Sequence, residues 1–104
     1  MFEVKYRDGM ARLGELRTAH GIIETPALLP VVNPKKLTLS VDELGECGAT
    51  ALITNSYLIW KEEELRKRAI KEGVHGLLDW SKPIMTDSGT FQAYMYGDVE
   101  VLPE

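Results

Sequence analysis

A carboxylate, a hydroxyl and an aromatic ring lie close together in the segment PIMTDSGTFQ, residues 83–92. Asp87 and Ser88 follow a short apolar run, Gly89 leaves the backbone open to a ligand, and Phe91 offers a flat apolar face. Asp-Ser-Gly is also a common turn sequence, in which Asp caps backbone N–H groups and Gly adopts a positive φ. From residue types alone, Asp87 is therefore either a turn residue or a catalytic carboxylate.

An amide is predicted to lie beside this carboxylate. The segment ALITNS begins at residue 51 and PIMTDS begins 32 residues later, and both read as apolar residues, then Thr, then Asn or Asp, then Ser. That spacing fits one strand–helix–strand unit of about 30 residues. An earlier apolar run ends at Asn33, so Asn33, Asn55 and Asp87 are expected at the carboxyl edge of one parallel sheet. A carboxylate, an amide, a hydroxyl and an aromatic ring together suit a planar heterocycle attached to a sugar.

The elements that must position these groups are an N-terminal hairpin and a set of strand–helix units. Residues 2–6 alternate apolar and charged, which indicates a half-buried strand, and residues 10–18 can return as its partner. Residues 27–32 are apolar on both faces, as in a buried parallel strand. Pro30 lies inside that run, and because proline cannot donate to a ladder we expect a bulge or an edge there.

Two helices and two further strands are predicted downstream. Ser40 and Glu43 form a capping box that starts a helix at Val41, and Gly48 is its expected end. A longer helix is expected over residues 57–73, with an apolar side (Leu58, Ile59, Leu65, Ala69, Ile70) and i, i+4 ion pairs (Glu62–Arg66, Glu63–Lys67, Glu64–Arg68). The strands are expected at 51–54 and 83–86, and residues 93–104 show no firm pattern.

Composition narrows the class of protein. The 104 residues suit one small domain, 44% of them are apolar, and the net charge of −4 provides no global basic field for nucleic acid. Cys47 is the only cysteine, which rules out an intrachain disulfide and a Cys-rich zinc site within this chain. The N-terminus is too charged for a signal peptide, and no apolar run approaches the roughly 20 residues of a membrane span. We therefore expect a cytoplasmic location and no membrane partner.

The chain resembles the N-terminal part of a tRNA-guanine transglycosylase, most closely the archaeal, archaeosine-forming type. The resemblance rests on ETPALLPVVNP, ITNSY, MTDSGTFQ and YGDVEV, in the family's order and spacing, and it covers essentially all 104 residues. VVNP and DSGTFQ favour the archaeal form, since the bacterial queuine-type enzymes usually read DSGGFQ.

This resemblance implies an α/β fold, the N-terminal portion of a (β/α)8 barrel preceded by an antiparallel β-hairpin. Residues 1–104 would form a partial catalytic barrel domain, with the hairpin over 1–25 and the first βα units over 26–104. The implied reaction replaces a guanine in the tRNA D-arm with 7-cyano-7-deazaguanine through a covalent enzyme–ribose intermediate. The implied partners are tRNA and a 7-deazaguanine base. The family's zinc site is expected beyond residue 104, and no metal site is expected in this chain.

The resemblance also assigns roles to single residues. Asp87 matches a family aspartate that acts as the nucleophile, as an acid/base or as a base-recognition residue, and these roles stay open. Asn55 matches an amide that orients the catalytic carboxylate, and Ser88 matches a residue lining the base pocket. Phe91 matches the aromatic residue that stacks on the base, and Gln92 in the same motif is assigned to substrate binding.

Half an active site at most is expected here, because the family's second catalytic aspartate also lies beyond residue 104. We therefore expect the 104-residue chain to be inactive alone. Because its strand edges are unpaired, we also expect it to self-associate, to bind the remainder of the enzyme, or to be partly disordered when alone. Three alternatives stay open. The chain could be a non-catalytic segment that completes a partner's barrel, part of a queuine-type enzyme, or a free-standing α/β binding domain.

Overall fold

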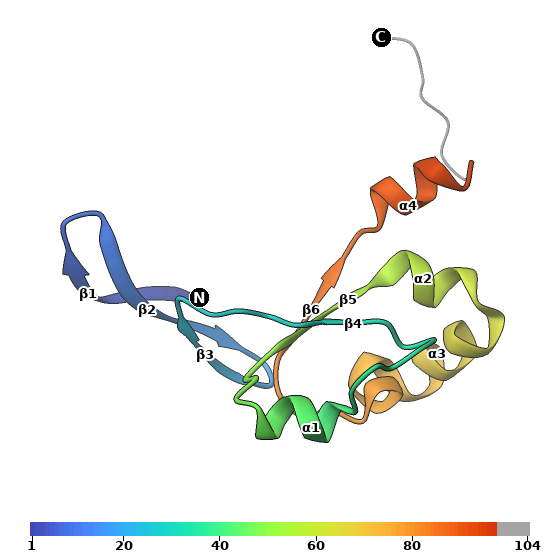
Figure 1. Cartoon of the computed structure of the whole chain (residues 1–104), viewed down its shortest axis with the longest axis horizontal. Helices are drawn as coiled ribbons and strands as arrows, with labels where there is room; N and C mark the ends of the chain where they lie inside the picture. The colour runs from blue at the N-terminus through green and yellow to red at the C-terminus, as the bar shows by residue number, and fades with distance from the viewer. Residues whose placement is uncertain (98–104) are drawn as a thin grey trace, which may run out of the picture.

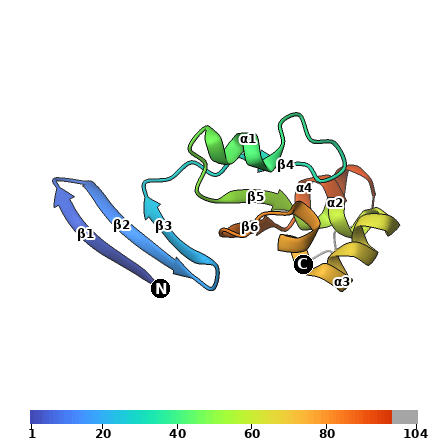
Figure 2. The same ribbon diagram turned by 90° about the horizontal axis from the view of Figure 1, so that it is seen from below.

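The computed structural model describes residues 1–97, which form two separate sheets with helices beside the second (Figure 1). The first sheet is antiparallel, in the order β1 (Phe2–Asp8), β2 (Ala11–Thr18) and β3 (Gly21–Thr25). It lies to one side of the rest of the chain (Figure 2). The expected hairpin is confirmed as β1 and β2, and β3 extends it to three strands because the turn after Thr18 returns the chain once more.

The second sheet is parallel, as predicted. Its order is β4 (Val31–Val32), β5 (Leu52–Asn55) and β6 (Ile84–Asp87). Both pairings run in the same direction, with Ile53 opposite Val31 on one side and Met85 on the other. The spacing of 32 residues between the two Thr-Asn/Asp-Ser motifs therefore does correspond to one strand–helix–strand unit.

The prediction of a buried strand over residues 27–32 is wrong in extent. Only Val31 and Val32 pair with β5, and Leu28 and Val31 are 86% and 79% exposed. Pro26 precedes the run and Pro30 interrupts it, and each lacks the N–H that a ladder requires. The edge expected at Pro30 is confirmed, since β4 is an edge strand of the described sheet and the Pro30 carbonyl accepts a bond from the Ile53 N–H at 3.0 Å.

The two faces of the parallel sheet differ. On one face Val32 and Leu52 pack into a buried cluster with Val41, Leu78 and Trp80, which come from the helices and the segment after them. On the other face Val31 and Met85 are exposed within the described residues, flanking Ile53. Helices on one face of a parallel sheet are what a (β/α)8 barrel presents on its outside, with the other face packed inside. The described chain has a mixed α/β fold, and the closed barrel stays a prediction.

Helix α1 (Val41–Glu46) begins as expected. The Ser40 hydroxyl accepts from the Glu43 N–H at 3.1 Å, and the Glu43 carboxylate accepts from the Ser40 N–H at 3.4 Å. These two bonds satisfy N–H groups that the first turn of a helix otherwise leaves without partners. Cys47 caps the other end, and the chain leaves the helix through Gly48.

The prediction of a single helix over residues 57–73 is wrong, because the structure has two helices there. Helix α2 (Ser56–Lys61) ends at Glu62, which is extended, and α3 (Glu63–Leu78) starts at the next residue. Gly73 does interrupt the helix, with φ 75° and ψ 171°, but helical turns resume and continue to Leu78.

The ion pairs explain part of this difference. Glu62 pairs with Lys35 at 2.8 Å, across 27 residues, rather than with Arg66 on its own helix. Arg66 instead donates to the Trp60 carbonyl at 3.1 Å. Of the three predicted pairs, Glu63–Lys67 forms at 2.9 Å, while Arg68 pairs with Glu72. Ile70 was expected on the buried apolar side of the helix, but its side chain is 81% exposed.

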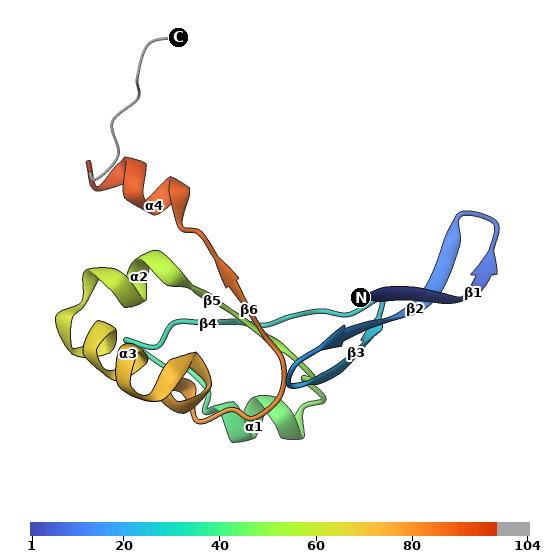
Figure 3. The same ribbon diagram turned by 180° about the vertical axis from the view of Figure 1, so that it is seen from behind.

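One further helix was not predicted. Helix α4 (Thr90–Met95) follows β6 directly and extends away from α1 and α3 (Figure 3). The sequence showed no firm pattern over residues 93–104, and residues 98–104 of that segment lie outside the described residues.

Replacing Thr54 with valine should lower the free energy of unfolding by about 1–2 kcal/mol. The buried Thr54 hydroxyl donates to the Val32 carbonyl at 2.7 Å, and valine would leave that carbonyl without this partner. Thr50→Val is the matched control, because Thr50 is exposed and lies just before β5, the strand that contains Thr54. Urea unfolding of the purified protein measures both changes, and equal values would contradict a role for the Thr54 bond in holding β4.

Candidate active site

The predicted amide and carboxylate lie side by side at the carboxyl edge of the parallel sheet. Asn55 and Asp87 are the last residues of β5 and β6, and they are direct partners in the register. Asn33 follows the end of β4, so all three polar residues mark the same edge. Alternation along the strands puts Asn55 and Asp87 on the side of Ile53 and Met85, which is the side without helices.

Asn55 is fixed by its own helix. Its side-chain oxygen accepts from the Leu58 N–H at 3.1 Å and so caps α2. The residue is only 8% exposed. A buried cap of this kind gives the amide one defined position beside Asp87.

Asp87 is exposed, and its backbone is held by the neighbouring strand. The Ser56 hydroxyl, at the start of α2, donates to the Asp87 carbonyl at 2.7 Å. Helix α4 begins after Gly89, which has no side chain and so cannot itself supply a cap hydrogen bond. Within the described residues the Asp87 carboxylate forms no hydrogen bond to the first turn of α4 either, which weakens the interpretation of Asp87 as a turn residue.

The turn itself depends on Gly89. This residue is buried and left-handed, with φ 72°, and a Cβ built on it would lie 2.4 Å from the Tyr57 Cβ and 2.6 Å from the Asn55 Oδ1. The absence of a side chain lets the β6–α4 turn approach Asn55 and Tyr57 closely. On either side of Gly89, the Ser88 and Thr90 hydroxyls bond to each other at 2.9 Å.

The other predicted site residues lie in the first turns of α4. Phe91 is 70% exposed, so its ring is open to a planar ligand, while Gln92 is half-buried. Ser88 is exposed next to Asp87. The structure therefore gathers Asn55, Asp87 and Ser88 around two adjacent strand ends and places Phe91 and Gln92 on the helix that follows.

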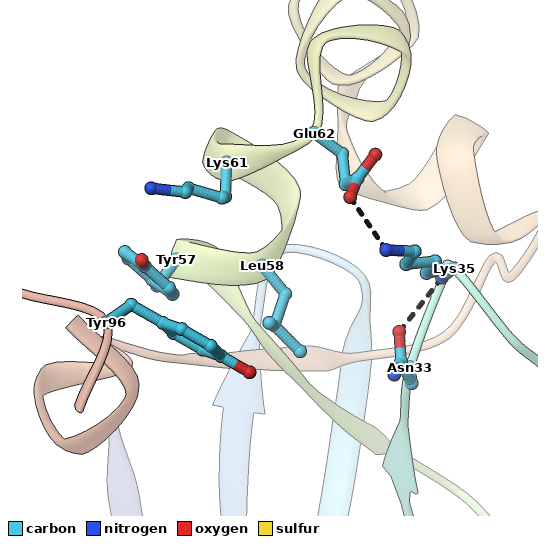
Figure 4. Close-up of a pocket in the computed structure, with 7 residues that line it drawn as sticks. All are labelled: Asn33, Lys35, Tyr57, Leu58, Lys61, Glu62 and Tyr96. Carbon is cyan, nitrogen blue, oxygen red and sulfur yellow. Dashed lines mark hydrogen bonds and ion pairs between the residues drawn. The ribbon is translucent and has the colours of Figure 1, made fainter.

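A hollow of about 220 Å³, which we call the tyrosine hollow, opens on the same edge of the sheet (Figure 4). The Tyr57 and Tyr96 rings stack along one wall, with centroids 6.2 Å apart and an angle of 11° between them. The Lys61 ammonium lies 6.0 Å from the Tyr57 ring. The hollow is lined by Asn33, Lys35, Tyr57, Leu58, Lys61, Glu62 and Tyr96. Asp87 and Phe91 do not line it, so it adjoins the carboxylate without containing it.

One ion pair shapes the far side of the tyrosine hollow. Lys35 bonds to Glu62 at 2.8 Å, and its backbone N–H donates to the Asn33 side-chain oxygen at 3.0 Å. The hydrogen bond to Glu62, and then the charge of that carboxylate, raise the pKa of Lys35 above its ordinary value. The link between Lys35 and Glu62 joins the loop after β4 to the break between α2 and α3.

Sequence reasoning missed Ser56, Tyr57 and Tyr96 as members of this edge. A signal for Ser56 was present, because Ser follows both Asn55 and Asp87 in the repeated motif. Tyr57 and Tyr96 gave no comparable signal, since their rings meet only when α2 and α4 are both in place.

Within residues 1–97, no group of three or more His, Cys, Asp or Glu side chains is arranged to hold a metal ion. No helix in this part of the chain is long and apolar enough to cross a membrane.

Comparison with known proteins agrees with the resemblance in the motifs. The model of the family described as queuine tRNA-ribosyltransferase matches residues 8–103. A tRNA-guanine(15) transglycosylase of Methanosphaera stadtmanae is 54% identical over 103 residues, covering 99% of this chain and 15% of the relative. Proteins of the same name from Methanosarcina acetivorans and Methanopyrus kandleri are 52% and 54% identical, covering 100% and 99% of this chain and 21% and 22% of their own lengths.

This chain thus spans between about a seventh and a little over a fifth of the length of these relatives. The match nevertheless includes both sheets and the candidate site. Since the family model covers nearly all of the residues and the relatives share about half of them, the chain belongs to the tRNA-guanine transglycosylase family, in its archaeal type.

Proposed function

We propose that this chain supplies part of the active site of an enzyme that exchanges a D-arm guanine of tRNA for 7-cyano-7-deazaguanine, a step in archaeosine biosynthesis. The observation that carries the proposal is the exposed Asp87 carboxylate, which ends β6 beside Asn55 and does not cap α4. The relatives' name, tRNA-guanine(15) transglycosylase, supports the same reaction and the same class of substrate.

The chemistry is a double displacement at the ribose anomeric carbon. A carboxylate oxygen bonds to the anomeric carbon while the bond between that carbon and the guanine nitrogen breaks. The departing guanine takes a proton from an acid. The incoming base then loses a proton, its nitrogen bonds to the same carbon, and the carboxylate leaves. This sequence needs two carboxyl groups, as in retaining glycosidases. Asp87 would be one of them, as nucleophile or as acid/base, and the second would come from another part of the barrel.

The neighbouring groups would hold the base and the carboxylate. Asn55, fixed as the α2 cap, would orient Asp87, and Ser88 would line the base pocket. The exposed Phe91 ring would stack on the base, and Gln92 would contact substrate from the same helix. Stacking on aromatic side chains is a common way for proteins to hold an unpaired base.

The tyrosine hollow fits a nucleotide next to the reacting one. Its stacked tyrosines offer an aromatic wall, while the charge of Lys35 on the other side is paired with Glu62. Stacking of bases on aromatic rings is typical of sites for single-stranded nucleic acid.

The remaining parts of the proposal concern assembly and location. The exposed face of Val31 and Met85 would be covered by further strands of a (β/α)8 barrel, or by self-association if those strands are absent. The zinc expected from the family would be held by residues outside the described part of this chain. A cytoplasmic location fits an enzyme that acts on tRNA.

A hybrid enzyme tests the proposal directly. Residues 1–104 would replace the matching segment of the Methanosarcina acetivorans relative, to which they are 52% identical throughout. We expect the hybrid to incorporate labelled 7-cyano-7-deazaguanine into a tRNA transcript, because this chain carries the complete edge of Asn55, Asp87 and Ser88. A folded hybrid that binds tRNA but incorporates no base, beside an active parent enzyme, would overturn the proposed function.

The alternatives give different results in the same assay. If the chain were a non-catalytic segment that only completes a barrel, an Asp87→Ala hybrid would work as well as the unsubstituted hybrid. If the chain came from a queuine-type enzyme, the hybrid would prefer a different 7-deazaguanine base over 7-cyano-7-deazaguanine. The name of the relatives favours neither alternative.

A further inference from the structure

The strongest unassigned contact near the candidate site joins two strand–helix units. The Ser56 hydroxyl, on the first residue of α2, donates to the Asp87 carbonyl, on the last residue of β6, at 2.7 Å. The two residues are 31 positions apart in the chain. None of the roles inferred from the motifs involves Ser56.

The positions of Ser56 and Asp87 let this hydrogen bond influence the direction in which the Asp87 carboxylate points. Ser56 directly follows Asn55, whose side chain caps α2, so the hydroxyl starts from a fixed backbone. Asp87 is exposed, so few atoms besides the neighbouring Asn55 surround its side chain. The direction of the carboxylate then depends also on the backbone that carries it, and a bond to the Asp87 carbonyl fixes the peptide plane between Asp87 and Ser88.

The turn at Gly89 makes the Ser56–Asp87 hydrogen bond more important for holding the backbone at Asp87. Gly89 is left-handed, and helix α4 starts next to it without a side-chain cap. The ladder of β5 and β6 ends at the pair Asn55 and Asp87, so no ladder bond restrains the peptide planes beyond it. The hydrogen bond from the Ser56 hydroxyl to the Asp87 carbonyl links the segments after β5 and β6 one peptide beyond the end of the ladder.

We propose that Ser56 is a positioning residue for Asp87: its hydroxyl holds the Asp87 carbonyl and thereby aims the carboxylate at the reacting carbon. This inference rests on the proposed function, because it assumes that Asp87 takes part in base exchange. A misplacement of about 1 Å in a catalytic group can cost about a hundredfold in rate. The effect should therefore appear in kcat, whereas binding of tRNA and of the base should change little.

The test compares Ser56→Ala and Ser56→Thr in the hybrid enzyme. We expect Ser56→Ala to lower kcat by about tenfold to a hundredfold, with KM for tRNA and for the base within about twofold. Ser56→Thr keeps the hydroxyl and should recover most of the rate. Thr18→Val is the matched control, since the Thr18 hydroxyl makes the same kind of bond, to the Gly21 carbonyl at 2.8 Å, in the N-terminal sheet. This control should leave kcat unchanged.

A purely structural role for Ser56 gives different results. If kcat of Ser56→Ala stayed within about twofold, or if its loss disappeared at temperatures well below the unfolding midpoint, the positioning role would be overturned. Crystal structures of the hybrid with and without Ser56→Ala provide a readout that needs no turnover. We expect a displaced or disordered Asp87 carboxylate in the variant, and an unmoved carboxylate would overturn the proposal. If the unsubstituted hybrid is inactive while the carboxylate still moves, the proposed function fails and the positioning of Asp87 stands.

Discussion

Replacing Asp87 with asparagine in the hybrid enzyme should reduce base exchange by about a thousandfold or more and leave the unfolding midpoint nearly unchanged. The rate falls because an amide can neither attack the anomeric carbon as a carboxylate does nor exchange a proton with the base. The fold is retained because Asp87 is exposed and α4 starts without a side-chain cap. Incorporation of labelled 7-cyano-7-deazaguanine and thermal unfolding measure the two effects.

Asp8→Asn is the control for this substitution. Asp8 is also an exposed aspartate at the last position of a strand, but it ends β1 in the other sheet. It should lose no activity. The turn interpretation would prevail if Asp87→Ala melted the protein while Asp87→Asn kept near-normal rates, because asparagine can replace aspartate in a turn.

Replacing Gly89 with alanine should lower the free energy of unfolding by roughly 3 kcal/mol or more and abolish exchange. Two costs combine at this position. The backbone is left-handed, with φ 72°, and a Cβ would lie 2.4 Å from the Tyr57 Cβ. Relief of that contact requires the turn after Asp87 to move away from α2, which also displaces the carboxylate.

Gly9→Ala separates the two costs. Gly9 is also left-handed, with φ 58°, but a Cβ built on it meets nothing within 4 Å. This control should cost only about 1 kcal/mol. Chemical unfolding of both variants checks the difference. Equal losses would mean that the contact with Tyr57 does not matter, and that the turn could relax without disturbing the site.

The sequence placed the polar edge of the parallel sheet correctly because a repeated pattern marks the ends of its strands. The repeated Thr-Asn/Asp-Ser motif, at a spacing typical of one strand–helix–strand unit, was enough to place Asn55 and Asp87 on adjacent strands. The capping box at Ser40 and Glu43 likewise contains both of its partners within four residues. Such patterns need no knowledge of the distant chain.

The failures are failures of distant contacts. Glu62 has a suitable partner one helical turn away in Arg66, and only the loop after β4 reveals that Lys35 competes for it. The break between α2 and α3 occurs at that residue. The tyrosine hollow was invisible for the same reason, because Tyr57 and Tyr96 come from separate helices. The roles assigned to all five predicted site residues, Asn55 and Asp87 included, stay predictions.

The parallel pairing of the second sheet also sets an order of events during synthesis. The antiparallel strands pair with their immediate neighbours along the chain, so they can form as soon as each turn emerges from the ribosome. The bond from Thr54 to Val32 must close a separation of 22 residues, and that from Ser56 to Asp87 a separation of 31. Asn55 is therefore made before its register partner Asp87, and the β5 edge stays unpaired until β6 is available. During that interval the row of Val31 and Ile53 is a surface that a chaperone would recognise.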